Sequence, residues 1–140
     1  MRKIEYIVIH CTATSQDATV AAIQNYWQQV LGWKTPGYHY LIDKYGNSTQ
    51  LLGIEKVANG VKNYNANSIH ISYIGGIDAA GKSIDNRTIS QKETILFLLR
   101  QLKRKFPKAI IQGHRDFPNV KKDCPCFNVK KEYEAIFDYI

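Results

Sequence analysis

The feature that most constrains this chain is the alternation of short β-rich segments with stretches that have helical periodicity. The first β-rich segment, residues 4–10, is mostly apolar and predicts a central strand. Two further segments flank Lys44-Tyr45-Gly46-Asn47, a sequence typical of a hairpin turn. The segments that we expect to form strands are residues 4–10, 38–43, 48–52, 68–74 and 109–112.

Three other stretches predict helices. The first has Thr19 as a suitable N-cap and Gly32 as a suitable end, around apolar residues at helical spacing: Val20, Ile23, Trp27, Val30 and Leu31. The second opens on a capping-box pattern, Ser90-Gln91-Lys92-Glu93, and stops before Pro107. Its apolar stripe consists of Ile95, Leu98, Leu99 and Leu102. A last helix is expected from about Val129 to Asp138.

Helices that alternate with strands, together with one hairpin, predict a mixed sheet covered by helices. The sequence has no repeat, low-complexity tract or linker, and its 140 residues are the length of one domain. We therefore expect an α/β fold, with a single domain over residues 1–140 and a central mixed β-sheet flanked by about three helices. The polar stretch between residues 53 and 67 is expected to be a surface loop.

Composition excludes several classes of protein. With 44% hydrophobic and 22% charged residues, the chain is neither disordered nor a coiled coil. No apolar run approaches the ~18 residues of a membrane span, and the N-terminus does not resemble a signal peptide. We therefore expect no membrane insertion. The net charge of +7 favours a polyanionic partner such as nucleic acid, a membrane surface or an anionic cell wall.

Histidine and cysteine residues lie where predicted strands end. His10 ends the first strand, His114 follows the last one, and Cys124 and Cys126 lie in the loop beyond it. Ligands bind at strand ends in open α/β sheets, and two imidazoles with one thiolate leave one position of a zinc ion open for catalysis. An odd count of three cysteines suits a reduced compartment or a metal. Taken singly, each histidine could equally be a hydrogen-bonded surface residue, and Cys-x-Cys is not by itself a zinc motif.

Six short motifs follow one another in an order that resembles a known family. They are His10-Cys11-Thr12-Ala13-Thr14, Gly37-Tyr38-His39-Tyr40, Asn67-Ser68-Ile69, Gly75-Gly76-Ile77-Asp78, Gly113-His114-Arg115-Asp116 and Lys122-Asp123-Cys124-Pro125. Together they resemble the zinc-dependent N-acetylmuramoyl-L-alanine amidases of the phage-lysozyme and peptidoglycan-recognition type. The resemblance implies a small mixed-sheet fold. It also implies cleavage of the amide between the muramic lactyl group and L-alanine of peptidoglycan.

Carried over residue by residue, the resemblance implies that His10, His114 and Cys124 are the zinc ligands. Cys124 fits the family pattern Lys-x-Cys-Pro, but the sequence alone leaves Cys126 open as the third ligand. Tyr38 and Lys122 match residues that act on the substrate. Lys122 would stabilise the oxyanion, while Tyr38 would donate a hydrogen bond or help to transfer a proton. Without the resemblance, Tyr38 reads as a strand residue and Lys122 as part of a solvated basic loop.

Several neighbouring residues have no role fixed by the sequence. Asp116 could orient a ligand or cap the turn before Pro118. Roles for His39 in the structure or in substrate binding are both open, and Cys11 is expected to be buried and inert. The chain also departs from the family pattern twice. It has Gly60-Val61-Lys62 where relatives often have histidine before alanine, and His70 where many have glycine.

The leading hypothesis is therefore a zinc-dependent amidase that cuts peptidoglycan as an endolysin does, of phage or prophage type. We expect it to be a monomer that needs no nucleic-acid partner. It would be made in the cytoplasm without a signal peptide and would act on the cell wall, in the periplasm, after release. The alternative is a non-catalytic peptidoglycan-binding module of the same fold.

Overall fold

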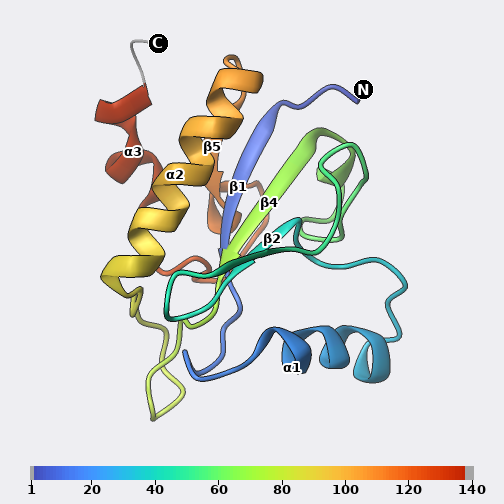
Figure 1. Cartoon of the computed structure of the whole chain (residues 1–140), viewed down its shortest axis with the longest axis vertical. Helices are drawn as coiled ribbons and strands as arrows, with labels where there is room; N and C mark the ends of the chain where they lie inside the picture. Colours follow the sequence, from blue (N-terminus) through green and yellow to red (C-terminus); the bar gives the residue numbers. More distant parts are fainter. Residues whose placement is uncertain (1, 138–140) are drawn as a thin grey trace.

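The computed structural model describes residues 2–137 and shows an α/β fold built on a five-stranded mixed sheet with strand order β3-β2-β4-β1-β5 (Figure 1). The strands are β1 (Tyr6–Cys11), β2 (Tyr40–Ile42), β3 (Ser48–Gln50), β4 (Ser68–Tyr73) and β5 (Ile110–Gly113). Neighbouring strands are parallel except for β2 and β3, which form the predicted antiparallel hairpin. The predicted fold class and the five predicted strands are confirmed.

Two helices cover one face of the sheet. They are α2 (Ile89–Lys105) and α3 (Val129–Phe137), and the predicted stripe of α2 is buried at Ile95, Leu98, Leu99 and Leu102. Side chains alternate along β4, so Ile69, Ile71 and Tyr73 join these helices in one hydrophobic core. This core attaches the two helices to the sheet. The alternate residues of β4 point to the opposite face.

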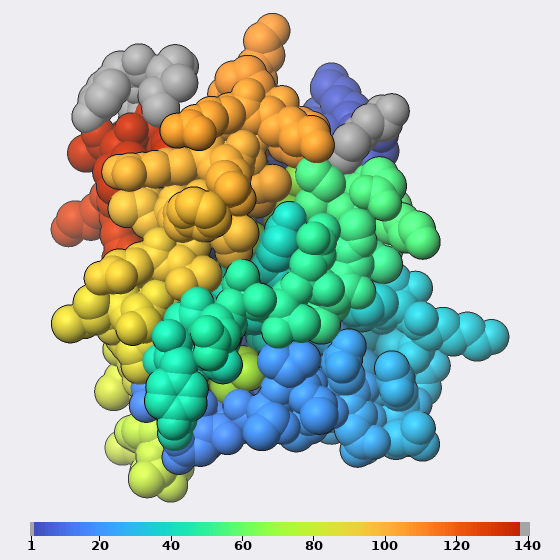
Figure 2. All heavy atoms as spheres, viewed as in Figure 1, coloured from blue at the N-terminus to red at the C-terminus, as the bar shows by residue number. Residues whose placement is uncertain are grey.

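The opposite face of the sheet is polar although it is buried. Ser68, His70 and Ser72 of β4 lie there and are fully buried. Part of this face is covered by α1 (Val20–Asn25), which continues as a π-helical turn over Tyr26–Val30. Trp27 and Ile23 of this segment pack with Leu41 and Ile74. Figure 2 shows the hairpin and the loop after it, in teal and green, filling the space between α2 and α1 in this view.

The predicted helix ends are partly confirmed. Thr19 accepts a hydrogen bond from Ala22 N as the N-cap of α1, and Gly32 has a φ of 68° just beyond the last turn. The capping box of α2 begins two residues earlier in the sequence than predicted. The N-cap is Thr88 and its partner is Gln91, whereas Ser90 lies inside the helix.

Two remaining expectations concern the loop and the last helix. Residues 53–67 are irregular apart from a short 3₁₀ turn, η2 (Asn65–Asn67). The predicted last residue of the final helix, Asp138, lies outside the described residues. Among residues 2–137, no helix has the length and apolar character needed to cross a membrane.

Candidate functional site

The parallel pairing of β1 and β5 brings two predicted site residues together. Ile9 is paired with Gly113, so His10 near the end of β1 and His114 just after β5 lie at the same edge of the sheet. Their ring centroids are 4.9 Å apart. His10 is buried, and His114 is half-buried at the start of the 3₁₀ turn η3 (His114–Asp116). This edge is where the sequence placed the site.

Cys124 reaches this edge from the loop between η3 and α3. Its carbonyl accepts a hydrogen bond from Arg115 N at 2.9 Å, and its Sγ accepts one from Cys11 N at 3.1 Å. These contacts place Sγ 4.0 Å from His10 Nδ1. One ligand atom from each of His10, His114 and Cys124 falls within 4.8 Å of the others. The structure thus groups the three residues that the sequence proposed as ligands.

Cys126 points to a different environment. Its Sγ lies 3.9 Å from Cys11 Sγ and donates to Gly76 O at 3.4 Å. Burial is the main reason that its pKa rises to about 11, so this thiol is protonated near neutral pH. Cys11 is buried as expected, and hydrogen bonding with Cys124 together with burial raises its pKa as well. The geometry therefore favours Cys124 over Cys126 as a ligand.

The two proposed catalytic side chains lie next to the His-His-Cys group. Tyr38 is half-buried just before β2, with its ring centroid 5.0 Å from that of His10 and its hydroxyl donating to Cys11 O at 3.3 Å. Burial, together with the nearby Cys124, raises the pKa of Tyr38, so the phenol keeps its proton. Lys122 is exposed.

The imidazoles of the His-His-Cys group are neutral at neutral pH. Burial lowers the pKa of His114 to about 4, and the charge of Lys122 adds to this effect. Burial also holds the pKa of His10 well below its ordinary value, with further contributions from His70, His114 and Lys122. A neutral imidazole offers a lone pair on one ring nitrogen, as a metal ligand must.

A cavity of about 440 Å³ opens beside His114 and Lys122. Its other walls come from Trp33, from the loop over residues 59–64 and from residues 118–120. The cavity is large enough to accept part of a substrate next to the His-His-Cys group.

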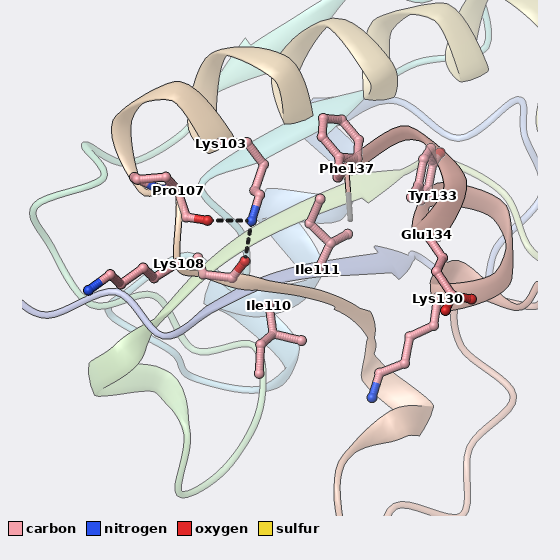
Figure 3. A pocket seen from close by; sticks show the side chains of 10 residues that line it. Lys103, Pro107, Lys108, Ile110, Ile111, Lys130, Tyr133, Glu134 and Phe137 are labelled. Carbon is pink, nitrogen blue, oxygen red and sulfur yellow. Dashed lines mark hydrogen bonds between the residues drawn. The ribbon is translucent and has the colours of Figure 1, made fainter. Parts of the chain in front are cut away.

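A second cavity, of about 470 Å³, lies between α2, β5 and α3 (Figure 3). Lys103 projects into it, but its Nζ donates to Pro107 O and Ala109 O, both at 2.8 Å, and so ties down the chain between α2 and β5. None of the predicted site residues lines this cavity. The candidate site is therefore at the edge formed by β1 and β5.

The structure also gives partners to residues that the sequence left without a role. Asp116 accepts a hydrogen bond from Gly113 N at 2.7 Å and so caps the turn after β5. His39 is fully buried and accepts from His70 N at 3.0 Å. His70 lies 2.8 Å from His10, measured from Nδ1 to Nε2. Sequence reasoning noted His70 as a departure from the family pattern but did not connect it with the site.

An open sheet edge with two imidazoles and a thiol beside a cavity is typical of metal-dependent hydrolases. A family model described as N-acetylmuramoyl-L-alanine amidase matches residues 1–127, and the chain belongs to this family. The endolysin of Enterobacteria phage T3 is 37% identical over 134 residues, covering 93% of this chain and 85% of the relative. The endolysin of Escherichia phage T7 is 36% identical over 132 residues, covering 91% and 84%.

Solved structures share the fold. The Ph2119 endolysin from a Thermus scotoductus bacteriophage superposes with a TM-score of 0.81 at 24% identity, covering 96% of this chain and 85% of that chain. The bumblebee peptidoglycan-recognition protein SA superposes with a TM-score of 0.78 at 20% identity, covering 100% and 86%. The family match and the endolysin relatives confirm the resemblance inferred from the six motifs, and the solved structures confirm its fold.

Proposed function

We propose that this protein hydrolyses the amide bond between N-acetylmuramic acid and L-alanine of peptidoglycan, with one zinc ion held by His10, His114 and Cys124. The observation that carries the proposal is the grouping of these three ligand atoms within 4.8 Å in a chain of the amidase family. The endolysin relatives support peptidoglycan as the substrate. The net charge of +7 would concentrate the protein on an anionic cell wall.

The donor set fits zinc. A tetrahedral zinc ion with bonds of about 2.0–2.3 Å holds its ligand atoms roughly 3.5 Å apart, so the three side chains are close to the spacing that the ion requires. Both imidazoles are neutral, and three protein ligands leave a fourth position open. Zinc held there would polarise the scissile carbonyl and lower the pKa of a bound water toward roughly 7.

The remaining site residues supply charge and hydrogen bonds. The ammonium group of Lys122 would stabilise the negative charge that develops on the carbonyl oxygen in the transition state. The hydroxyl of Tyr38 has one proton, which it donates to Cys11 O in this structure, and on substrate binding it would donate that proton to the reacting group or to the leaving amine instead. Peptidoglycan would lie in the cavity walled by Trp33 and residues 59–64.

The place of action follows from the same relatives. We infer that the protein acts on the cell wall in the manner of a phage endolysin, as a monomer, after release from the cytoplasm in which it is made. We propose neither a nucleic-acid partner nor membrane insertion for this protein.

The test measures two quantities on the same samples, namely zinc per chain and the release of L-alanine amino groups from purified peptidoglycan. Wild type should hold about one zinc ion and release amines. Cys124→Ala should lose both, and the matched variant Cys126→Ala should keep both. Zinc retained by Cys124→Ala but lost by Cys126→Ala would move the third ligand to Cys126. A wild type that binds peptidoglycan but releases no amines would establish the binding module instead.

A further inference from the structure

The four histidines of the chain form one continuous row on the polar face of the sheet. Ring centroids are 5.9 Å apart from His39 to His70, 4.9 Å from His70 to His10 and 4.9 Å from His10 to His114. Only the last two belong to the proposed ligand set. The other two are fully buried, and their ring nitrogens have partners whose chemistry fixes the direction of each hydrogen bond.

Asn65 determines which atoms donate and which accept in these hydrogen bonds. Its Oδ1 accepts hydrogen bonds from Gly60 N at 3.0 Å and from Val61 N at 2.7 Å. An atom that receives two backbone N–H groups must be the amide oxygen, which cannot donate. The same oxygen lies 2.9 Å from His70 Nε2, so His70 Nε2 carries a proton and donates it to Asn65.

The proton position on His70 in turn determines the proton position on His10. With its one proton on Nε2, the neutral His70 ring has its lone pair on Nδ1, which lies 2.8 Å from His10 Nε2. His10 must therefore donate from Nε2, which leaves the lone pair of His10 on Nδ1. That atom is the one that lies 4.0 Å from Cys124 Sγ. Two hydrogen bonds thus connect an amide anchored on the backbone to the nitrogen of His10 that faces the His-His-Cys group.

His70 is also held by His39, through both its backbone and its ring. The backbone N–H of His70 donates to His39 Nδ1 at 3.0 Å, and the two rings stack with centroids 5.9 Å apart. His39 is fixed in turn because its Nε2 donates to Lys56 O at 2.7 Å. A Cβ atom at Gly60 would lie 2.6 Å from Cγ of His70, so the ring occupies the space that a side chain at position 60 would need. Gly60 and His70, the two departures from the family pattern, are therefore in contact and form one feature.

We propose that His70 is a positioning residue of the metal centre, which selects the tautomer of His10 and presents its Nδ1 to zinc, with Asn65 fixing the direction. A histidine that binds metal through one nitrogen usually donates its other N–H to a carboxylate or carbonyl, and here a second imidazole accepts that proton. The inference rests on the proposed zinc site. Removing such a partner of a ligand typically lowers metal affinity by about 10–100-fold.

Two variants of similar size separate the hydrogen bond from packing. His70→Leu fills the space but cannot accept from His10. His70→Asn places its side-chain oxygen near the position of Nδ1 and can still accept. We expect the zinc dissociation constant, measured by competition with a chromophoric chelator, to rise by about 10–100-fold in His70→Leu and to stay within a few-fold of wild type in His70→Asn.

A second readout does not depend on zinc. Long-range ¹H–¹⁵N correlation spectra of the metal-free wild type should show His10 and His70 both protonated at Nε2. If His70→Leu does not fold, Gly60→Ala provides the same test, because its Cβ displaces the His70 ring without removing a polar atom. Its zinc affinity should also fall.

The outcomes distinguish the two proposals. Wild type that binds no zinc overturns the metal centre and the positioning role with it. Wild type that binds zinc, with unchanged affinity in folded His70→Leu or Gly60→Ala, overturns the positioning role alone. Protonation of His10 at Nδ1 in the metal-free protein also overturns it.

Discussion

Among the five residues assigned to the candidate site, Lys122 is the one with an exposed side chain. Its charge nevertheless helps to lower the pKa of both His10 and His114, so the ammonium group acts on the same space as the proposed ligands. We expect Lys122→Met to reduce kcat by about 10²-fold, because the charge that stabilises the oxyanion is removed. Zinc content should not change, since Lys122 offers no ligand atom.

Lys121 provides the matched control for this measurement. It is the neighbouring residue and is also exposed, so Lys121→Met removes the same charge from the same loop. We therefore compare kcat of the two variants on purified peptidoglycan. It should fall in Lys122→Met and stay near wild type in Lys121→Met if the Lys122 ammonium acts on the oxyanion itself. Equal losses in the two variants would mean that the positive charge only attracts the protein to the wall.

Tyr38, in contrast, is held by its neighbours. Its ring makes an edge contact with Trp27, with centroids 5.3 Å apart, and its hydroxyl donates to the carbonyl of Cys11. Because its pKa is raised, Tyr38 serves as a hydrogen-bond donor at neutral pH. Its position and its charge state thus agree with the role proposed for it.

At the scale of the elements, the start of α2 allows a direct test of the capping box. Thr88 Oγ1 accepts from Gln91 N at 3.0 Å and donates to Lys44 O at 2.8 Å. We expect Thr88→Ala to lower the free energy of unfolding by about 1 kcal/mol, because one helix N–H loses its acceptor. Ser90→Ala, at an exposed position inside the helix, should change stability by less than about 0.5 kcal/mol. Urea denaturation measures both, and a larger loss in Ser90→Ala would contradict this assignment.

The capping box also illustrates what the sequence could predict. Within residues 2–137, apolar spacing located the three α-helices, because it reflects burial directly, and β-rich segments together with a turn signal located the five strands. The prediction placed the capping box at Ser90, but Thr88 also precedes a suitable partner by three residues, and the sequence pattern does not rank the two. Contacts from distant segments decide the choice, such as the bond from Gln91 Nε2 to Ile42 O at 3.2 Å.

The candidate site follows the same rule. His10 and His114 both lie where predicted strands end, and the family resemblance implied that they act together. Their proximity depends on the parallel pairing of β1 with β5, which the sequence did not specify. His70 lies in the middle of a strand and reaches His10 from the neighbouring strand, 60 residues away in sequence. Its orientation depends on Asn65, an amide in a loop that periodicity leaves undefined.

At the scale of the whole molecule, Arg87 joins the middle of the chain to its C-terminal part. Its guanidinium group is ion-paired with Asp85 and Glu132, each at 2.8 Å, and lies 3.4 Å from the centroid of the Phe127 ring. Phe127 belongs to the loop that carries Cys124, and Glu132 belongs to α3. Arg87 therefore helps to hold this loop against the sheet edge where the ligands meet.

The histidine row makes the stability of the whole fold depend on pH. Burial lowers the pKa of His39 and His114 to about 4 and holds the pKa of His10 and His70 well below the ordinary value. In the unfolded chain all four titrate near pH 6.5. Between about pH 4 and 6.5 the unfolded state therefore binds more protons than the folded state, so stability rises with pH.

We expect the metal-free protein to lose stability as the pH falls from about 7 to 5, with a slope of up to about 1.4 kcal/mol per pH unit for each histidine. Guanidinium unfolding followed by tryptophan fluorescence measures this slope. His39→Asn should reduce it by the share of one histidine, because asparagine keeps an acceptor near the position of Nδ1 but does not titrate. Asp85 and Glu132 contribute little to this slope. Arg87 lowers the pKa of both carboxylates in the folded protein, and in the unfolded chain they titrate near pH 4, so their effect on stability falls mainly below pH 5. Equal stability at pH 7 and pH 5 would mean that the row accepts protons while it is folded.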